Sequence, residues 1–247
     1  MSYAKVLTCS ALIPVVVLLV YVFSKDREKE PVGLLLKLLL AGAVCCIPAA
    51  LLEYPMSWLV GTVFGGIQNA AKTTAGWNRA YYLYYFFYAL LVPGLCEEGC
   101  KFLVLWKLTA HNREFDSSFD GIVYAVFVGL GFAALENIMY VFQGGFSTAL
   151  LRAWTAVPGH MFDAVFMGYF YSLWRQNLVW RGRSGHNRWR PHAIVCPMLV
   201  HGLYDFFAFL EEDSTFFTIG FYVLLAVLYM ICFRLIKTAS VSDHRFY

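Results

Sequence analysis

Long runs of apolar residues, separated by short polar stretches, dominate this chain of 247 residues. A run of about 20 apolar residues can cross the hydrocarbon core of a bilayer as one α-helix. The pattern therefore predicts an all-α polytopic membrane protein with about seven transmembrane helices. The predicted spans are residues 6–23, 33–52, 81–108, 120–142, about 150–174, 192–210 and 216–236, and residues 53–80 are expected to form an interfacial loop or a short re-entrant piece.

The composition supports this class and narrows the possible partners. Sixty per cent of the residues are hydrophobic and only 14% are charged, which is far from the composition of a soluble domain. The net charge of +3 is too small to indicate a nucleic-acid partner. No internal repeat divides the chain. We therefore treat residues 1–247 as a single integral membrane domain in the lipid bilayer, with residues 81–210 as the core that carries the candidate chemistry.

Positively charged side chains are unevenly distributed between the loops on the two sides of the predicted helices. Because Lys and Arg concentrate in loops that stay in the cytoplasm, the richer side is expected to be cytoplasmic. The N-terminus is then outside and the C-terminus is cytoplasmic. The richer set is Lys25, Arg27, Lys29, Lys107, Arg113, Arg175, Arg181, Arg183, Arg188, Arg190, Arg234, Lys237 and Arg245, against Lys5, Lys72, Arg79 and Arg152 on the other side.

The predicted span 81–108 contains three charged residues, Glu97, Glu98 and Lys101. A charge inside a bilayer costs several kcal/mol unless it is paired or hydrated, so such residues indicate a functional site. On a helix, Lys101 is four residues after Glu97 and three after Glu98, so its amine can reach either carboxylate. Pro93 and Gly94, one turn earlier, loosen the helix and free backbone carbonyls. The competing interpretation is a charge triad that only fixes helix packing.

Three other predicted spans also carry ionisable residues, namely Glu136, His160 and His201. At a rise of about 1.5 Å per residue, these groups and Glu97 lie in the middle or outer half of the bilayer. Burying each alone would be very costly, so we expect them to meet in a wet cavity. Asp205 follows His201 by four residues and can orient its imidazole, and Asp163 stands three residues after His160. Small residues around Glu136 allow a neighbouring helix to approach closely.

Two hydrolytic chemistries fit these residues. Two histidines and a carboxylate form a catalytic zinc set, so Glu136, His160 and His201 could hold zinc while Glu97 acts as general base. Alternatively, Glu97 activates water without a metal and a histidine donates to the developing oxyanion. An ion-coupled transporter uses the same types of intramembrane residue and is the main non-hydrolytic alternative.

Four segments between Leu91 and Phe206 resemble the motifs of the PrsW family of intramembrane proteases. Glu97-Glu98-Gly-Cys-Lys101 resembles its EExxK motif, and Phe132-Ala-Ala-Leu-Glu136-Asn137 resembles its FxxxE segment. Pro158-Gly-His160 and His201-Gly-Leu-Tyr-Asp205 are similar to its two histidine segments. The family is similar in turn to the CAAX prenyl protease superfamily, which implies a CAAX-protease-like core of helices around the site.

The resemblance implies an endopeptidase of the bacterial cell membrane that makes the first-site cut in a membrane-anchored anti-sigma factor or a similar single-span protein. Prenylated substrates are the alternative, but Lys101 and Glu136 depart from the CAAX pattern, where an arginine and a histidine are usual. A non-catalytic membrane chaperone is a further alternative. The implied catalytic residues are Glu97, Glu98, Glu136, His160 and His201, with Lys101, Asp205, Phe132 and Asn137 in support.

Overall fold

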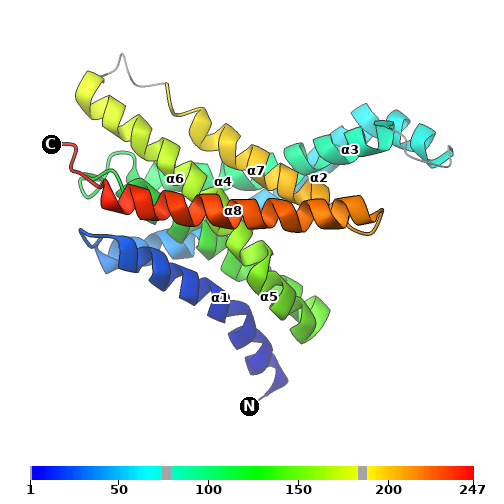
Figure 1. The fold of residues 1–247 in the computed structure, drawn as a ribbon, viewed down its shortest axis with the longest axis horizontal. Coiled ribbons are helices and arrows are strands. Elements are labelled where there is room, and N and C mark those ends of the chain that lie inside the picture. The colour runs from blue at the N-terminus through cyan, green and yellow to red at the C-terminus, as the bar shows by residue number, and fades with distance from the viewer. Residues whose placement is uncertain (1, 74–78, 183–187) are drawn as a thin grey trace.

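The computed structural model describes residues 2–73, 79–182 and 188–247 as a bundle of helices (Figure 1). Within those residues, the only β-structure is one isolated bridge between Ser117 and Arg245. The helices are α1 (Tyr3–Lys25), α2 (Val32–Thr73), α3 (Arg79–Ala89), the π-helix η1 (Leu90–Gly94), α4 (Leu95–Thr109), α5 (Asp120–Trp154), α6 (Ala156–Arg181), α7 (His192–Phe209) and α8 (Thr215–Val241).

Five helical stretches of the described residues are long and apolar enough to cross a membrane. One of them, Asp120–Arg181, holds both α5 and α6. The stretch Arg79–Thr109, which carries the first three candidate charges, is not among the five. The all-α membrane class is therefore confirmed, whereas the count of about seven spans stays a prediction.

Helix α2 corrects the expectation of a loop over residues 53–80. It continues through Pro48 and Pro55 to Thr73, and residues 74–78 lie outside the described residues. Each proline removes one backbone donor, but a segment in lipid must satisfy its remaining backbone groups internally. Continuing the helix achieves this, so the proline and small polar residues do not end it.

Helix α5 packs against α1, α2, α4 and α6 and forms the middle of the bundle. A Cβ atom at Gly131 would lie 2.1 Å from the carbonyl oxygen of Leu39, so only glycine allows α2 to approach this closely. A Cβ atom at Gly129 would lie 2.8 Å from the Cβ of Ala164 in α6. The expected close approach of neighbouring helices around Glu136 is thus confirmed, and it places α6 beside the site.

Helix α5 turns sharply at Gly145, whose φ of 75° is left-handed. Glycine adopts this conformation without the steric cost that a Cβ atom adds. Residues 146–154 therefore leave the direction of the preceding helix, and α6 begins at Ala156 rather than near residue 150. The loop position expected for Arg152 is wrong, because only 14% of its side chain is exposed and it forms an ion pair with Glu136.

The expected loosening of the helix at Pro93 and Gly94 is confirmed, because both residues lie in the π-helix η1. Short π-helical turns occur often at functional sites. A Cβ atom at Gly94 would lie 3.0 Å from the carbonyl oxygen of Met198, so α7 packs directly against this turn. The turn thereby brings α4 and α7, with Glu97 and His201, to the same level of the bundle.

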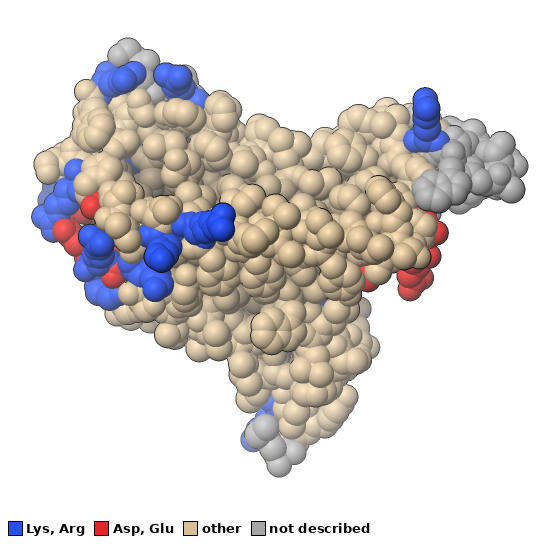
Figure 2. Space-filling view, viewed as in Figure 1, with Lys and Arg blue, Asp and Glu red and all other residues tan. Residues whose placement is uncertain are grey.

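The end of the bundle that holds the C-terminus is rich in Lys and Arg (Figure 2). At this end, the α1–α2 linker places Glu30 at 6% exposure, where the Tyr124 hydroxyl donates a 2.5 Å hydrogen bond to its Oε2. Burial raises the pKa of Glu30 from its ordinary 4.5 to about 9, with the Tyr124 hydrogen bond lowering it and the Asp120 charge raising it. Glu30 is therefore protonated in the folded protein at neutral pH.

We expect Glu30→Gln to flatten the pH dependence of stability. The folded state holds the Glu30 proton more tightly than the unfolded state. The contribution of Glu30 to the stability of the parent is therefore complete below about pH 4.5 and is lost as the pH rises through about 9. The loss is at most about 1.4 kcal/mol per pH unit. Melting temperatures in detergent from pH 5 to 9 measure it, with exposed Glu212→Gln as the control. Parallel curves for Glu30→Gln and the parent would show that Glu30 does not take up this proton.

Candidate active site

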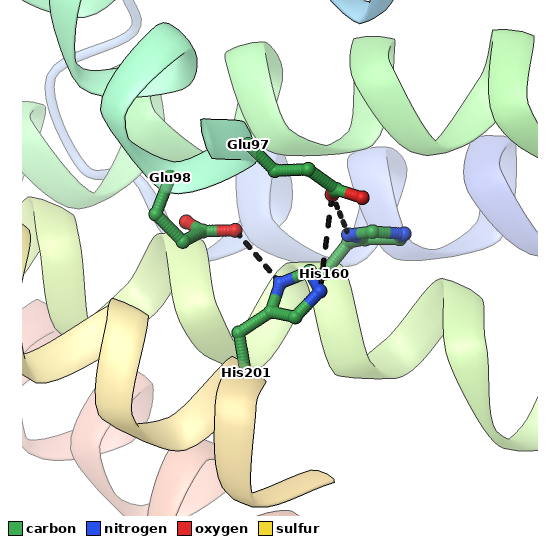
Figure 3. Close-up of side chains that lie close together, drawn as sticks. All are labelled: Glu97, Glu98, His160 and His201. Carbon is green, nitrogen blue, oxygen red and sulfur yellow. Dashed lines mark hydrogen bonds and ion pairs between the residues drawn. The ribbon is translucent and has the colours of Figure 1, made fainter. Parts of the chain in front are cut away.

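Glu97 and Glu98 lie in the first turn of α4, directly after the π-helix (Figure 3). Their side chains point toward His160 of α6 and His201 of α7. Glu98 is completely buried, whereas Glu97 is 7% exposed and lines a cavity of about 460 Å³. The two carboxylates therefore differ in their access to water and substrate, and Glu97 is the one in contact with the cavity.

Lys101 lies behind the two glutamates and is 2% exposed. Its Nζ is 2.7 Å from Glu98 Oε1, 3.1 Å from Glu97 Oε2 and 3.1 Å from His160 Nδ1. The same ammonium lies 4.1 Å from the centre of the Phe132 ring. The predicted contact of Lys101 with both glutamates is thus confirmed, and Phe132 covers the amine from the side of α5.

His160 is held at both ring nitrogens. Its Nε2 is 2.7 Å from Glu136 Oε2, and its Nδ1 faces Lys101 and lies 4.0 Å from Glu97 Oε2. A lysine ammonium only donates hydrogen bonds, so Nδ1 accepts and the hydrogen of a neutral ring is on Nε2. Nε2 therefore donates to Glu136, and the lone pair of Nδ1 points toward Lys101 Nζ, with Glu97 Oε2 at 4.0 Å.

His201 is surrounded by four carboxylates. Its Nδ1 is 3.0 Å from Glu98 Oε1 and 3.2 Å from Asp163 Oδ2, and its Nε2 is 3.4 Å from Asp205 Oδ2 and 3.9 Å from Glu97 Oε2. The predicted pairing of His201 with Asp205 is confirmed. Asp163, which the spacing placed next to His160, instead pairs with His201, because helix packing turns it toward α7.

Four of the residues form a group suited to a metal ion. One ligand atom each from Glu97, Glu98, His160 and His201 lies within 4.8 Å of the other three. Glu98 Oε2 is buried and has no hydrogen-bond partner among the described residues, so a further cation or donor would satisfy it. Two imidazoles with carboxylates are a donor set that zinc accepts. The residues present therefore fit a divalent metal.

Glu136 occupies a different place from these four. Its Oε2 contacts His160 Nε2 and also Arg152 Nη2, each at 2.7 Å. Asn137 is buried, and its Nδ2 donates to the backbone oxygen of Ala11 in α1. Glu136 as a metal ligand stays a prediction. Its carboxylate contacts His160 and Arg152, and it is not one of the four residues of the group suited to a metal ion.

Arg152 and Glu53 both line the cavity, but the apolar pattern placed them in connecting segments. Glu53 lies in the middle of α2, which continues where the sequence indicated a loop. Arg152 reaches the site because of the turn at Gly145. The adjacent Gly144 and Gly145 are a sequence signal for such a turn.

Comparisons with known proteins identify the family of the chain. A family model described as PrsW family intramembrane metalloprotease matches residues 30–233. A protein described as Protease PrsW from Clostridioides difficile is 31% identical over 221 residues, which cover 87% of this chain and 84% of that protein. A protein of the same description from Bacillus subtilis is 30% identical over 213 residues, which cover 86% of this chain and 87% of that protein. No solved structure matches the chain, so the CAAX-protease-like core stays a prediction.

Proposed function

The chain belongs to the PrsW family of intramembrane metalloproteases, and from this membership we propose that it cleaves a single-span, membrane-anchored protein of the anti-sigma-factor type. As a member of this family it is a membrane-embedded peptidase. One observation supports the proposal most directly. Glu97 touches a cavity of about 460 Å³ that is large enough for a short peptide segment, with His160 and His201 on the walls of the same cavity.

We assign the metal to Glu98, His160 and His201, which leaves Glu97 free to act as a base. Two histidines and one glutamate are a donor set used by catalytic zinc. The unsatisfied Glu98 Oε2 and the closeness of one ligand atom from each of these residues, within 4.8 Å, support this choice. A bound divalent cation would polarise the carbonyl of the scissile bond as a Lewis acid.

The side chains around the cavity supply the proton transfers of peptide hydrolysis. Glu97 takes a proton from a water molecule, whose oxygen attacks the carbonyl carbon of the scissile bond. When the C–N bond breaks, Glu97 returns this proton to the leaving amine. Lys101, held by both glutamates, stabilises the negative charge around Glu97 during these steps. Asp163 lies beside His201 Nδ1 and Asp205 beside Nε2, so the nitrogen that does not hold the metal has a carboxylate acceptor that fixes the ring.

The charge distribution supports an orientation with the N-terminus outside and the C-terminus in the cytoplasm. Lys and Arg gather at the end that holds the C-terminus, while acidic side chains appear at the opposite end (Figure 2). The turn between α7 and α8 contains Glu211, Glu212 and Asp213. Because positive loops stay in the cytoplasm, we place this acidic turn outside. The scissile bond is then in the outer half of the substrate's transmembrane segment or just outside it.

Cleavage by the purified protein in liposomes tests this function. With equal pH and salt on both faces, a single-span test substrate should be cut, and mass spectrometry should map the cut to its outer half. The purified protein should also contain about one divalent metal ion per chain. Flux that follows an ion gradient without peptide products would instead identify a transporter. Cleavage only of prenylated substrates would identify a CAAX-type enzyme, and cuts at the cytoplasmic flank would overturn the orientation.

A further inference from the structure

Arg152 makes three separate contacts at the edge of the site. Its Nη2 is 2.7 Å from Glu136 Oε2, and its Nε donates a 2.8 Å hydrogen bond to Asn137 Oδ1. Its guanidinium carbon also lies 4.1 Å from the centre of the Tyr140 ring. A planar guanidinium can make all of these contacts at once, whereas an ammonium is a single point charge. Arg152 is therefore fixed in position and in orientation.

The turn at Gly145 is what makes these contacts possible. Arg152 follows Glu136 by 16 residues, which would separate them by about 24 Å along a straight helix. The left-handed φ of Gly145 returns the chain toward the site instead. Asn137 is in turn fixed to α1 through its hydrogen bond to the Ala11 oxygen. The contacts that hold Arg152 therefore extend through Asn137 to α1, beyond the catalytic residues.

The contacts continue from Arg152 through Glu136 to His160. One oxygen, Glu136 Oε2, accepts from both Arg152 Nη2 and His160 Nε2 at 2.7 Å. A histidine that binds a metal through one nitrogen usually donates from its other nitrogen to a carboxylate, which fixes the ring and its tautomer. Here the carboxylate is Glu136, and Arg152 determines where its oxygen lies.

We propose that Arg152 is a positioning residue, which acts through Glu136 to hold His160 with Nδ1 toward Lys101 and Glu97. The inference rests on the proposed function for the role of His160, but the contacts themselves do not depend on the substrate. Without Arg152, Glu136 can rotate away and His160 loses the acceptor that fixes its Nε2 hydrogen. The imidazole ring of His160 then rotates, for part of the time, away from the position in which it can bind a metal together with Glu98 and His201.

The test compares Arg152→Met, Arg152→Lys, Glu136→Gln and the double variant Arg152→Met/Glu136→Gln, with exposed Arg234→Met as the matched control. Loss of such a supporting partner typically reduces metal affinity or activity about 10- to 100-fold. We expect Arg152→Met to lower kcat by this factor with little change in KM, and to weaken Zn²⁺ retention against a chelator similarly. Arg152→Lys should recover part of both, and Arg234→Met should match the parent.

The double variant separates positioning from a general structural role. If Arg152 acts through Glu136, the double variant is no worse than Glu136→Gln alone in kcat and in Zn²⁺ retention. Losses that multiply, or parental Zn²⁺ retention in Arg152→Met, would overturn the inference. If Arg152→Met fails to fold, Arg152→Lys is used in its place. Parental kcat together with parental Zn²⁺ retention in Arg152→Lys would also overturn the inference. Zn²⁺ retention does not depend on cleavage of any substrate, so failure of the proposed function gives a different result.

Discussion

Glu97→Gln is expected to insert and fold like the parent and to lose peptide cleavage by about 100-fold to 10,000-fold. The amide has nearly the size of the carboxylate, but it cannot take a proton from water. Glu97 is the carboxylate of α4 that lines the cavity, whereas Glu98 is completely buried. Initial rates on a single-span substrate in liposomes, together with the melting temperature, measure the effect.

Glu114→Gln is the matched control for this substitution. Glu114 is exposed in the loop between α4 and α5, so the same chemical change there should leave the rate unchanged. Cleavage at the parental rate by Glu97→Gln would exclude Glu97 as the base. If Glu98→Gln loses cleavage as well, the rate alone does not distinguish the base from the metal ligand. The amount of Zn²⁺ that each variant retains then distinguishes them. We expect Glu97→Gln to retain the metal and Glu98→Gln to lose it.

Lys101→Met is expected to have the largest effect on the folded protein itself. The ammonium is the buried cation between Glu97 and Glu98, at 3.1 and 2.7 Å. Removing one partner of a buried ion pair typically costs about 3–5 kcal/mol, because the remaining charge has lost its compensation. We therefore expect a much lower yield of folded protein, a lower melting temperature and little or no cleavage.

Lys107→Met provides the control for Lys101→Met within the same helix. Lys107 is exposed in the last turn of α4, so its loss should change neither yield nor rate. Folding yield is measured as the monodisperse fraction in detergent, and stability as the melting temperature. Equal yield and equal stability of Lys101→Met and the parent would show that the two carboxylates do not depend on this amine.

The parts of the site that depend on local helix geometry could be predicted from the sequence. The contacts of Lys101 with Glu97 and Glu98 follow from spacings of four and three residues within one helix. The pairing of His201 with Asp205 follows in the same way. The meeting of α4, α6 and α7 was predictable from the cost of burying each polar group alone, since that cost is avoided only by mutual contact.

The parts that depend on a change of chain direction could not be predicted in this way. Arg152 had the appearance of a loop residue because apolar periodicity indicates where a helix lies but not where it turns back. Asp163 was placed beside His160 by its spacing, but it faces His201 across a helix interface. The length of α2 was underestimated because Pro55 suggests an end to the helix in sequence, whereas lipid favours continued internal hydrogen bonding.

The turn at Gly145 also has a consequence for how the chain enters the membrane. Glu136 and Arg152 lie on the two sides of this turn and contact each other at 2.7 Å. A hairpin that carries one anion and one cation in contact has no net charge, so its transfer into lipid costs much less than the transfer of either charge alone. The pair forms once both sides of the turn are in place. We therefore expect insertion of α5 before Gly145 to be coupled to that of residues 146–154, which lead into α6, and His160 to gain its acceptor Glu136 as they assemble.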